Sequence, residues 1–203
     1  MSPRNLRGER NRKKINTETR LDRTRSGTRQ ERSSFLILCE GKTERDYFIG
    51  MRSRRGPQID VDMPEVDHLS IVREARTRKS DEYSAVWCVL DTELDQSLAD
   101  DLAREATRAP VELCLSTPCF EVWLIMHHVD CTRPFQSAEE AKKKLKSLIP
   151  SWSEGTTRFS DFSHGLEDAC HRARKIDPTG REVSKNPSTN AWRLVIELKA
   201  GLD

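Results

Sequence analysis

The sequence lacks paired metal-binding cysteines, a long apolar run and a leader-like start. Its six cysteines form no Cys-x-x-Cys pair, and no histidine lies at zinc-finger spacing from one of them. We therefore expect buried, reduced thiols rather than a zinc site. No apolar run reaches the roughly 18 residues that a membrane span needs, and the N-terminus has no apolar signal segment. These absences favour a cytoplasmic protein without a membrane partner.

Charge is distributed unevenly along the 203 residues, although the net charge is only +2. Residues 1–33 carry eleven Lys and Arg against four Asp and Glu, whereas the rest of the chain carries 24 basic and 29 acidic residues. Residues 1–33 also contain almost no apolar side chains, so we expect a basic, disordered arm. Such an arm either contacts phosphates or an acidic partner, or is a solvated tail without a specific function. The residues leave both alternatives open.

Short apolar runs alternate with amphipathic segments over residues 34–130. The clearest runs, at residues 35–39, 85–90 and 111–115, are typical of parallel strands that are buried on both faces. Residues 58–66 predict a weaker strand, and the segments between strands predict helices. The pattern predicts an α/β core with a mostly parallel central sheet flanked by helices.

The remainder of the chain, residues 131–203, predicts a helical extension packed on this core. Apolar residues recur at helical spacing over residues 137–148, 162–176 and 191–199. Residues 177–189 are rich in Pro, Gly, Ser and Asn, and this composition predicts a loop.

Acidic residues follow the three clearest strands. Glu40 follows the first, and Asp91, Glu93 and Asp95 follow the second. Glu121 follows the third, beyond a Ser-Thr-Pro turn. Because the carboxyl ends of parallel strands meet at one edge of a sheet, we expect these side chains to converge there, where their mutual repulsion favours a bound cation. Oxygen ligands suit Mg²⁺ or Mn²⁺, and such an ion polarises a phosphodiester and activates water.

Three further residues are candidates for this site. Lys42 and Thr43 open a predicted helix, whose backbone N–H groups and lysine can hold a phosphate. A plain surface lysine is the alternative for Lys42. His127 ends an aromatic helix and is a candidate general base. The alternative is a histidine that only interacts with the helix dipole.

Four segments of the chain resemble the RloB-like family. They are residues 35–44 (Phe-Leu-Ile-Leu-Cys-Glu-Gly-Lys-Thr-Glu), 86–91 (Val-Trp-Cys-Val-Leu-Asp), 116–123 (Ser-Thr-Pro-Cys-Phe-Glu-Val-Trp) and 186–189 (Asn-Pro-Ser-Thr). The third segment is the most specific, because it combines two aromatic residues and a cysteine within eight positions. The resemblance covers nearly everything outside the basic arm.

The resemblance implies a Toprim-like fold, in which one Glu follows the first strand and an Asp-x-Asp pair follows a later one. Glu40 matches the first position, and Asp91 and Glu93 match the pair. The chain departs from the pattern here, because it reads Asp-Thr-Glu, so Glu93 and Asp95 compete for the second position. Glu121 matches an additional acid of the family.

The resemblance also implies a place in restriction, phage-defence or abortive-infection loci, with an ABC/SMC-like ATPase as partner. We therefore expect a metal-dependent nuclease, a defence effector that cleaves DNA or RNA, tRNA included. The alternative is a non-catalytic module with a degenerate Toprim fold that binds nucleic acid or the ATPase. Strand-passage or primase chemistry is disfavoured, because Tyr47 and Tyr83 are the only tyrosines and no topoisomerase domain is recognisable. The sequence indicates neither the trigger nor the oligomeric state.

Overall fold

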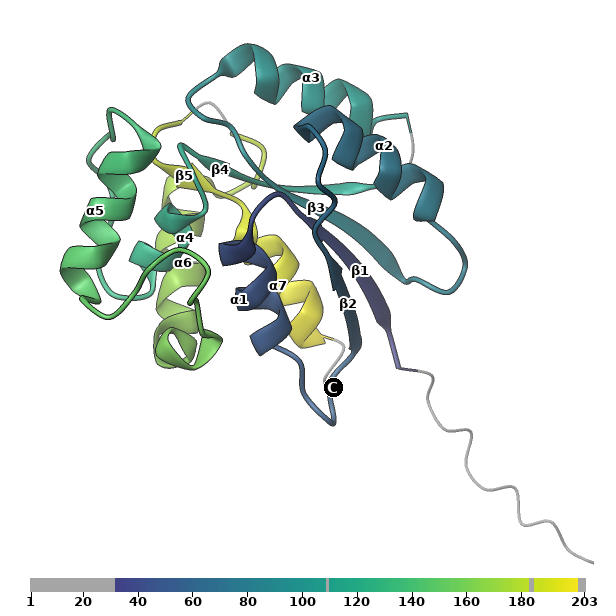
Figure 1. Cartoon of the computed structure of the whole chain (residues 1–203), viewed down its shortest axis with the longest axis horizontal. Coiled ribbons are helices and arrows are strands. Elements are labelled where there is room, and N and C mark those ends of the chain that lie inside the picture. The colour runs from purple at the N-terminus through teal and green to yellow at the C-terminus, as the bar shows by residue number, and fades with distance from the viewer. Residues whose placement is uncertain (1–31, 109, 183–184, 201–203) are drawn as a thin grey trace, which may run out of the picture. The chain divides into compact units, whose positions relative to one another are not determined.

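A computed structural model describes residues 32–108, 110–182 and 185–200 of the chain (Figure 1). Internal contacts group Arg32–Asp203 into one unit, separate from residues 1–31. The predicted basic arm, residues 1–33, therefore lies almost entirely outside the described residues.

The described unit is built on one five-stranded sheet in the order β2-β1-β3-β4-β5. Its strands are β1 (Ser34–Cys39), β2 (Gln58–Asp62), β3 (Ala85–Asp91), β4 (Glu112–Thr117) and β5 (Ser188–Thr189). The first four strands run parallel, and β5 pairs with β4 in the antiparallel direction. The predicted α/β class with a mostly parallel sheet is confirmed.

Helices cover both faces of the sheet (Figure 1). One face is covered by α2 (His68–Arg78) and α3 (Gln96–Ala106). The other carries α1 (Lys42–Gly50), α4 (Glu121–Met126), α5 (Ala138–Leu148), α6 (Leu166–Ile176) and α7 (Ala191–Ala200), with short 3₁₀ turns at Phe159–Asp161 and Ser163–Gly165. None of the helices in the described part of the chain has the length and apolar character needed to cross a membrane.

The apolar strand runs are explained by this two-sided burial. In β1, Leu36 and Leu38 contribute to the core beneath α2 and α3, whereas Phe35 and Ile37 contribute to the larger core on the opposite face. Successive strand residues point to opposite faces, so a strand covered on both sides needs apolar residues at every position.

The predicted loop at residues 177–189 is wrong at its end, because Ser188 and Thr189 form β5. Polar side chains make this pairing: Ser116 Oγ lies 2.9 Å from Thr189 Oγ1. The adjacent Asn190 is 4% exposed and closes the junction with α7. Its Oδ1 accepts from Leu115 N–H at 2.7 Å, and its Nδ2 donates to the carbonyls of Leu113 and Gly180 at 3.1 and 3.0 Å. The segment after residue 130 thus completes the sheet as well as adding helices.

We expect Asn190→Ala to lower the free energy of unfolding by about 3 kcal/mol, since it leaves buried backbone groups unpaired. Urea unfolding monitored by circular dichroism measures the effect. Gln136→Ala, at an exposed position, serves as the control and should stay within about 0.5 kcal/mol of the wild type. Equal unfolding midpoints for the two variants would show that Asn190 does not anchor the edge of the sheet.

Candidate functional site

The ends of three parallel strands bring acidic side chains to one cavity. Glu40 directly follows β1, Asp91 is the last residue of β3, and Glu121 opens α4 shortly after β4. The cavity has a volume of about 580 Å³. Its lining residues are Glu40, Gly41, Lys42, Thr43, Glu44, Asp91, Glu121, Lys142, Glu154 and Gly155. The predicted convergence of Glu40, Asp91 and Glu121 at this edge is therefore present in the structure.

Glu44, on the first turn of α1, adds a fourth carboxylate to the three from the strand ends. Its side chain is 5% exposed, and its Oε2 has no hydrogen-bond partner within the described part of the chain. Gly41 packs directly against this side chain, because a Cβ on residue 41 would lie only 2.6 Å from Glu44 Oε2. A larger residue at position 41 would therefore shift the Glu44 carboxylate, although the backbone φ of −127° suits any residue.

Burial makes the carboxyl groups of Glu44, Asp91 and Glu121 reluctant to ionise, and repulsion from neighbouring carboxylates adds to the effect at Glu44 and Asp91. Burial, followed by the charges on Glu121 and Glu40, raises the pKa of Glu44 from 4.5 to about 7. Burial, with the charges on Glu44, Glu40 and Glu121, raises the pKa of Asp91 well above its ordinary value. Burial also raises the pKa of Glu121, although the nearby charge on Lys142 opposes that rise. The cavity therefore carries more acidic groups than its own cations neutralise.

Two carboxylate oxygens that line the cavity lack a hydrogen-bond partner among the described residues. Asp91 Oδ1, like Glu44 Oε2, is enclosed and accepts no hydrogen bond from the described residues. Buried carboxylate oxygens are normally paired, and carboxylate donors suit Mg²⁺ or Mn²⁺. Glu44, Asp91, Glu121 and Glu40 line one cavity and offer the type of donor atom that a hard divalent cation takes.

Glu40 also contacts the opposite side of the sheet edge. Its Oε2 accepts a hydrogen bond from Asp91 N–H at 3.0 Å, and the same oxygen lies 3.0 Å from His68 Nε2. His68 is the first residue of α2, whose N-cap Asp67 accepts from Ser70 N–H. His68 was not among the predicted site residues, because it lies far along the chain from Glu40 and Asp91 and follows only a weak strand.

Glu93 and Asp95, the two acids predicted to compete for the second position of the Asp-x-Asp pair, have different surroundings in the structure. Asp95 is the N-cap of α3, where its Oδ1 accepts from the N–H groups of Ser97 and Leu98 at 2.8 and 3.1 Å. Glu93 is exposed and has a positive φ of 51°. Its carboxylate lies close to Glu40 and His68, with one ligand atom of each residue within 4.8 Å of the others. Neither Glu93 nor Asp95 lines the cavity that holds Asp91.

Two lysines face the acidic cavity. Lys42 is exposed at the start of α1, beside the buried Thr43, and both line the cavity as the phosphate-binding prediction requires. Lys142 was not among the predicted residues. It enters from α5 and forms an ion pair with Glu154. In the sequence, Lys142 belongs to a run of lysines, and such a run is typical of a solvent-exposed helix face.

His127 lies in the aromatic core rather than in the acidic cavity. Its side chain is 2% exposed, with Nδ1 2.8 Å from the Phe162 carbonyl and Nε2 3.1 Å from the Tyr47 hydroxyl. Burial lowers the pKa of His127 to about 3. His127 therefore lacks the access to a substrate that a general base needs.

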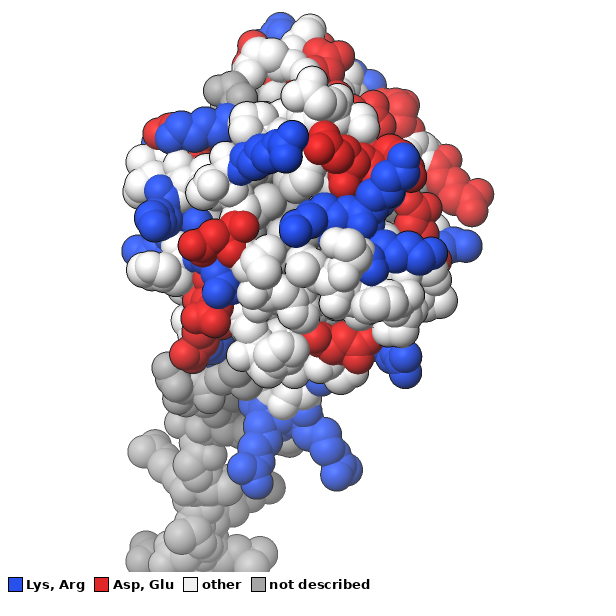
Figure 2. Space-filling view, turned by 90° about the vertical axis from the view of Figure 1, so that its left-hand side faces the viewer, with Lys and Arg blue, Asp and Glu red and all other residues white. Residues whose placement is uncertain are grey.

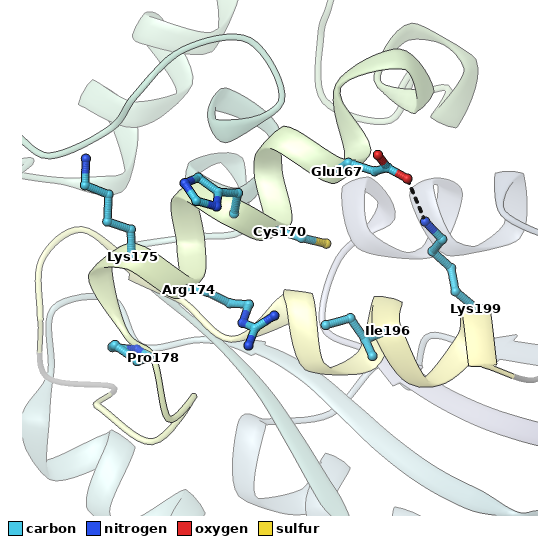
Figure 3. Close-up of a pocket in the computed structure, with 8 residues that line it drawn as sticks. Glu167, Cys170, Arg174, Lys175, Pro178, Ile196 and Lys199 are labelled. Carbon is cyan, nitrogen blue, oxygen red and sulfur yellow. Dashed lines mark hydrogen bonds and ion pairs between the residues drawn. The ribbon is translucent and has the colours of Figure 1, made fainter.

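A second hollow, of about 650 Å³, lies between α6 and α7 (Figure 3). Its lining includes the basic residues His171, Arg174, Lys175 and Lys199, and Lys199 pairs with Glu167 at 3.4 Å. No convergence of unpaired carboxylates occurs among its described lining residues. The acidic cavity is therefore the stronger candidate for chemistry, although it is the smaller of the two.

The fold and the site define an α/β protein with a cluster of acidic residues at the carboxyl edge of a mostly parallel sheet. A family model described as RloB-like protein matches residues 35–198, so the chain belongs to the RloB-like family. Neither a curated protein nor a solved structure matched the chain.

The raised pKa of Glu44 predicts a pH-dependent stability in the presence of EDTA. Between pH 4.5 and about 7 the folded state binds more protons than the unfolded state, so stability should fall as the pH rises through this window. A pKa of about 7 instead of 4.5 corresponds to a loss of about 3 kcal/mol. We expect Glu44→Gln to flatten this slope and to be more stable than the wild type at pH 8.

Urea unfolding at a series of pH values checks this expectation. Glu139→Gln changes an exposed acid on α5 and should retain the wild-type slope. A Glu44→Gln profile that parallels the wild type would show that Glu44 is ionised without penalty in the folded protein.

Proposed function

We propose that the protein is a Mg²⁺- or Mn²⁺-dependent nuclease that hydrolyses phosphodiester bonds in DNA or RNA. The observation that carries this proposal is the cluster of Glu40, Glu44, Asp91 and Glu121, with two enclosed oxygen atoms that have no partner within the described residues. A cluster of this charge is costly without a cation. Phosphodiester hydrolysis is a reaction that hard cations held by carboxylates support.

The residues around the cluster can divide the chemistry between them. Glu44, Asp91 and Glu121, with Glu40, would hold the cation, which when bound polarises a phosphoryl oxygen and lowers the pKa of a water molecule. Lys42 and Lys142 line the same cavity and would neutralise and orient the phosphate. Attack by water in line with the leaving oxygen breaks the P–O bond and leaves a phosphate monoester and a hydroxyl group.

Positive charge for a nucleic-acid backbone is limited on one face of the described unit. On the face that α5 occupies, Lys and Arg side chains are interspersed with Asp and Glu (Figure 2). Lys142 in the cavity is itself paired with Glu154. We infer that the substrate is held locally by the cavity lysines, with residues 1–33, which carry eleven Lys and Arg, as the further source of phosphate contacts.

Membership of the RloB-like family supports the wider part of the proposal. We propose a Toprim-like arrangement in which Glu40 and Asp91 provide its two principal acids. On the same basis we propose a cytoplasmic effector of phage defence or abortive infection, which acts with an ABC/SMC-like ATPase. The tRNA, RNA and DNA alternatives are separated by offering each as substrate.

We expect Asp91→Asn to reduce Mg²⁺- or Mn²⁺-dependent cleavage by at least about a hundredfold, since it removes a cation ligand without changing the shape of the side chain. Gel-based cleavage of labelled DNA, RNA and tRNA measures the rate. Asp100→Asn alters an exposed acid on α3 and should keep the wild-type rate. Full activity of folded Asp91→Asn would rule out the proposed site.

A second candidate function is a non-catalytic module that binds nucleic acid or a partner. It is favoured by the Asp-Thr-Glu departure, because Glu93 does not line the cavity that contains Asp91. Metal titration separates the two functions. The nuclease should gain about 2.7 kcal/mol of stability when Mg²⁺ reaches a hundred times its dissociation constant.

That gain should be absent from Asp91→Asn and present in Asp100→Asn, as measured by thermal unfolding in Mg²⁺ against EDTA. Equal unfolding temperatures of the wild type with and without Mg²⁺ or Mn²⁺ would favour the binding module.

A further inference from the structure

We propose that Glu40, His68 and Glu93 form a second cation position, in which His68 supplies a nitrogen ligand and selects Mn²⁺ over Mg²⁺. The inference rests on the proposed function, because Glu40 belongs to both positions. It goes further by naming a ligand and a metal preference that an all-carboxylate site does not have.

The spacing of the three side chains fits coordination of one ion. Each residue offers a ligand atom, and these atoms lie within 4.8 Å of one another. Glu40 Oε2 and His68 Nε2 are 3.0 Å apart. Two neighbouring ligands at right angles around an ion at about 2.1 Å are themselves about 3 Å apart. The observed separation is that of a direct ion pair, and it also equals the spacing of two ligands on one ion.

His68 Nε2 makes no hydrogen bond to the described residues, and its near neighbour is a carboxylate that would share the same ion. The atom is enclosed, yet it has no hydrogen-bond partner within the described residues. Its contact with Glu40 has the length of an ion pair, but the geometry of a hydrogen bond is absent. A buried ring nitrogen without a hydrogen bond is unusual, and imidazole nitrogen is a common metal ligand.

The loop after β3 holds Glu93 beside these two residues. Thr92 N–H donates to the Ser116 carbonyl at 3.0 Å, and Glu93 N–H donates to the Pro118 carbonyl at 3.1 Å. The two bonds fix this loop to the end of β4 and to the residue that follows it. Glu93 is thus presented by a tethered backbone, although its side chain is exposed.

The second position and the buried cluster draw their other ligands from different elements around Glu40. His68 opens α2, which belongs to one face of the sheet, whereas Glu44 and Glu121 belong to α1 and α4 on the other face. The buried cluster offers oxygen ligands only and suits Mg²⁺. A site with one imidazole favours a transition metal such as Mn²⁺, since imidazole nitrogen is a softer ligand than oxygen.

The test uses Mn²⁺ as the probe, because softer metals would also bind the six cysteines. Mn²⁺ binding to the full chain is followed by electron paramagnetic resonance, with pulsed detection of nitrogen-14 coupled to the ion. We expect the wild type to show a directly coordinated nitrogen, and His68→Gln to lose that signal and bind this ion at least about tenfold more weakly.

Glu93→Gln provides a second variant at an exposed position. It should weaken the binding of Mn²⁺ at the second position, and the variant should still fold. His171→Gln replaces an exposed histidine on α6 and should behave as the wild type. Absence of the nitrogen signal from the wild type, or its retention in His68→Gln, would overturn the second position.

The outcome is distinguishable from a failure of the proposed function. Glu121→Gln should lose cleavage and keep the nitrogen signal, because Glu121 is not a ligand of the second position. Cleavage by the wild type without any nitrogen signal would leave the nuclease standing and remove the second position. A nitrogen signal without cleavage of any nucleic acid would support the second position and contradict the proposed nuclease.

Discussion

Repulsion between carboxylates at one edge of the sheet is the constraint on which the site depends. Glu40, Glu44, Asp91 and Glu121 are held together although burial raises the pKa of three of them. Such an arrangement survives only where the surrounding fold is rigid enough to oppose it. The paired strands and the buried helix α4 provide that rigidity.

The more distant parts of the fold support the same edge. Every residue of α4 is buried, so Glu121 cannot swing away from the cluster without disrupting the core. β5 pairs with the last residues of β4, and Asn190 binds backbone groups of that strand. The C-terminal third of the chain thereby fixes the strand that precedes Glu121, and α5 places Lys142 in the cavity wall.

Strand ends are the part of this site that sequence can predict. Glu40 and Asp91 each follow a continuous apolar run, Glu121 follows a third strand after a Ser-Thr-Pro turn, and the parallel topology brings such positions together. Glu44 and Asp95 are both acids in or beside the first turn of a helix, a place that suits the helix dipole. Sequence alone therefore does not show that Glu44 joins the acidic cluster and that Asp95 caps α3. His127 follows an apolar helix and lies in the core, whereas His68 follows a weak strand and meets Glu40. Only tertiary packing distinguishes these cases.

Glu40 lies between the two faces of the sheet, with Asp91 N–H and His68 Nε2 both at one of its oxygens. If both proposed positions hold ions, those ions would share the single negative charge of Glu40, so the occupancy of one position would lower the affinity of the other. Thermodynamic linkage makes that effect reciprocal. The side chain of Glu40 would then act as a negative coupling element between the faces, and the metal content of the protein would depend on the ratio of the available ions as well as on their individual concentrations.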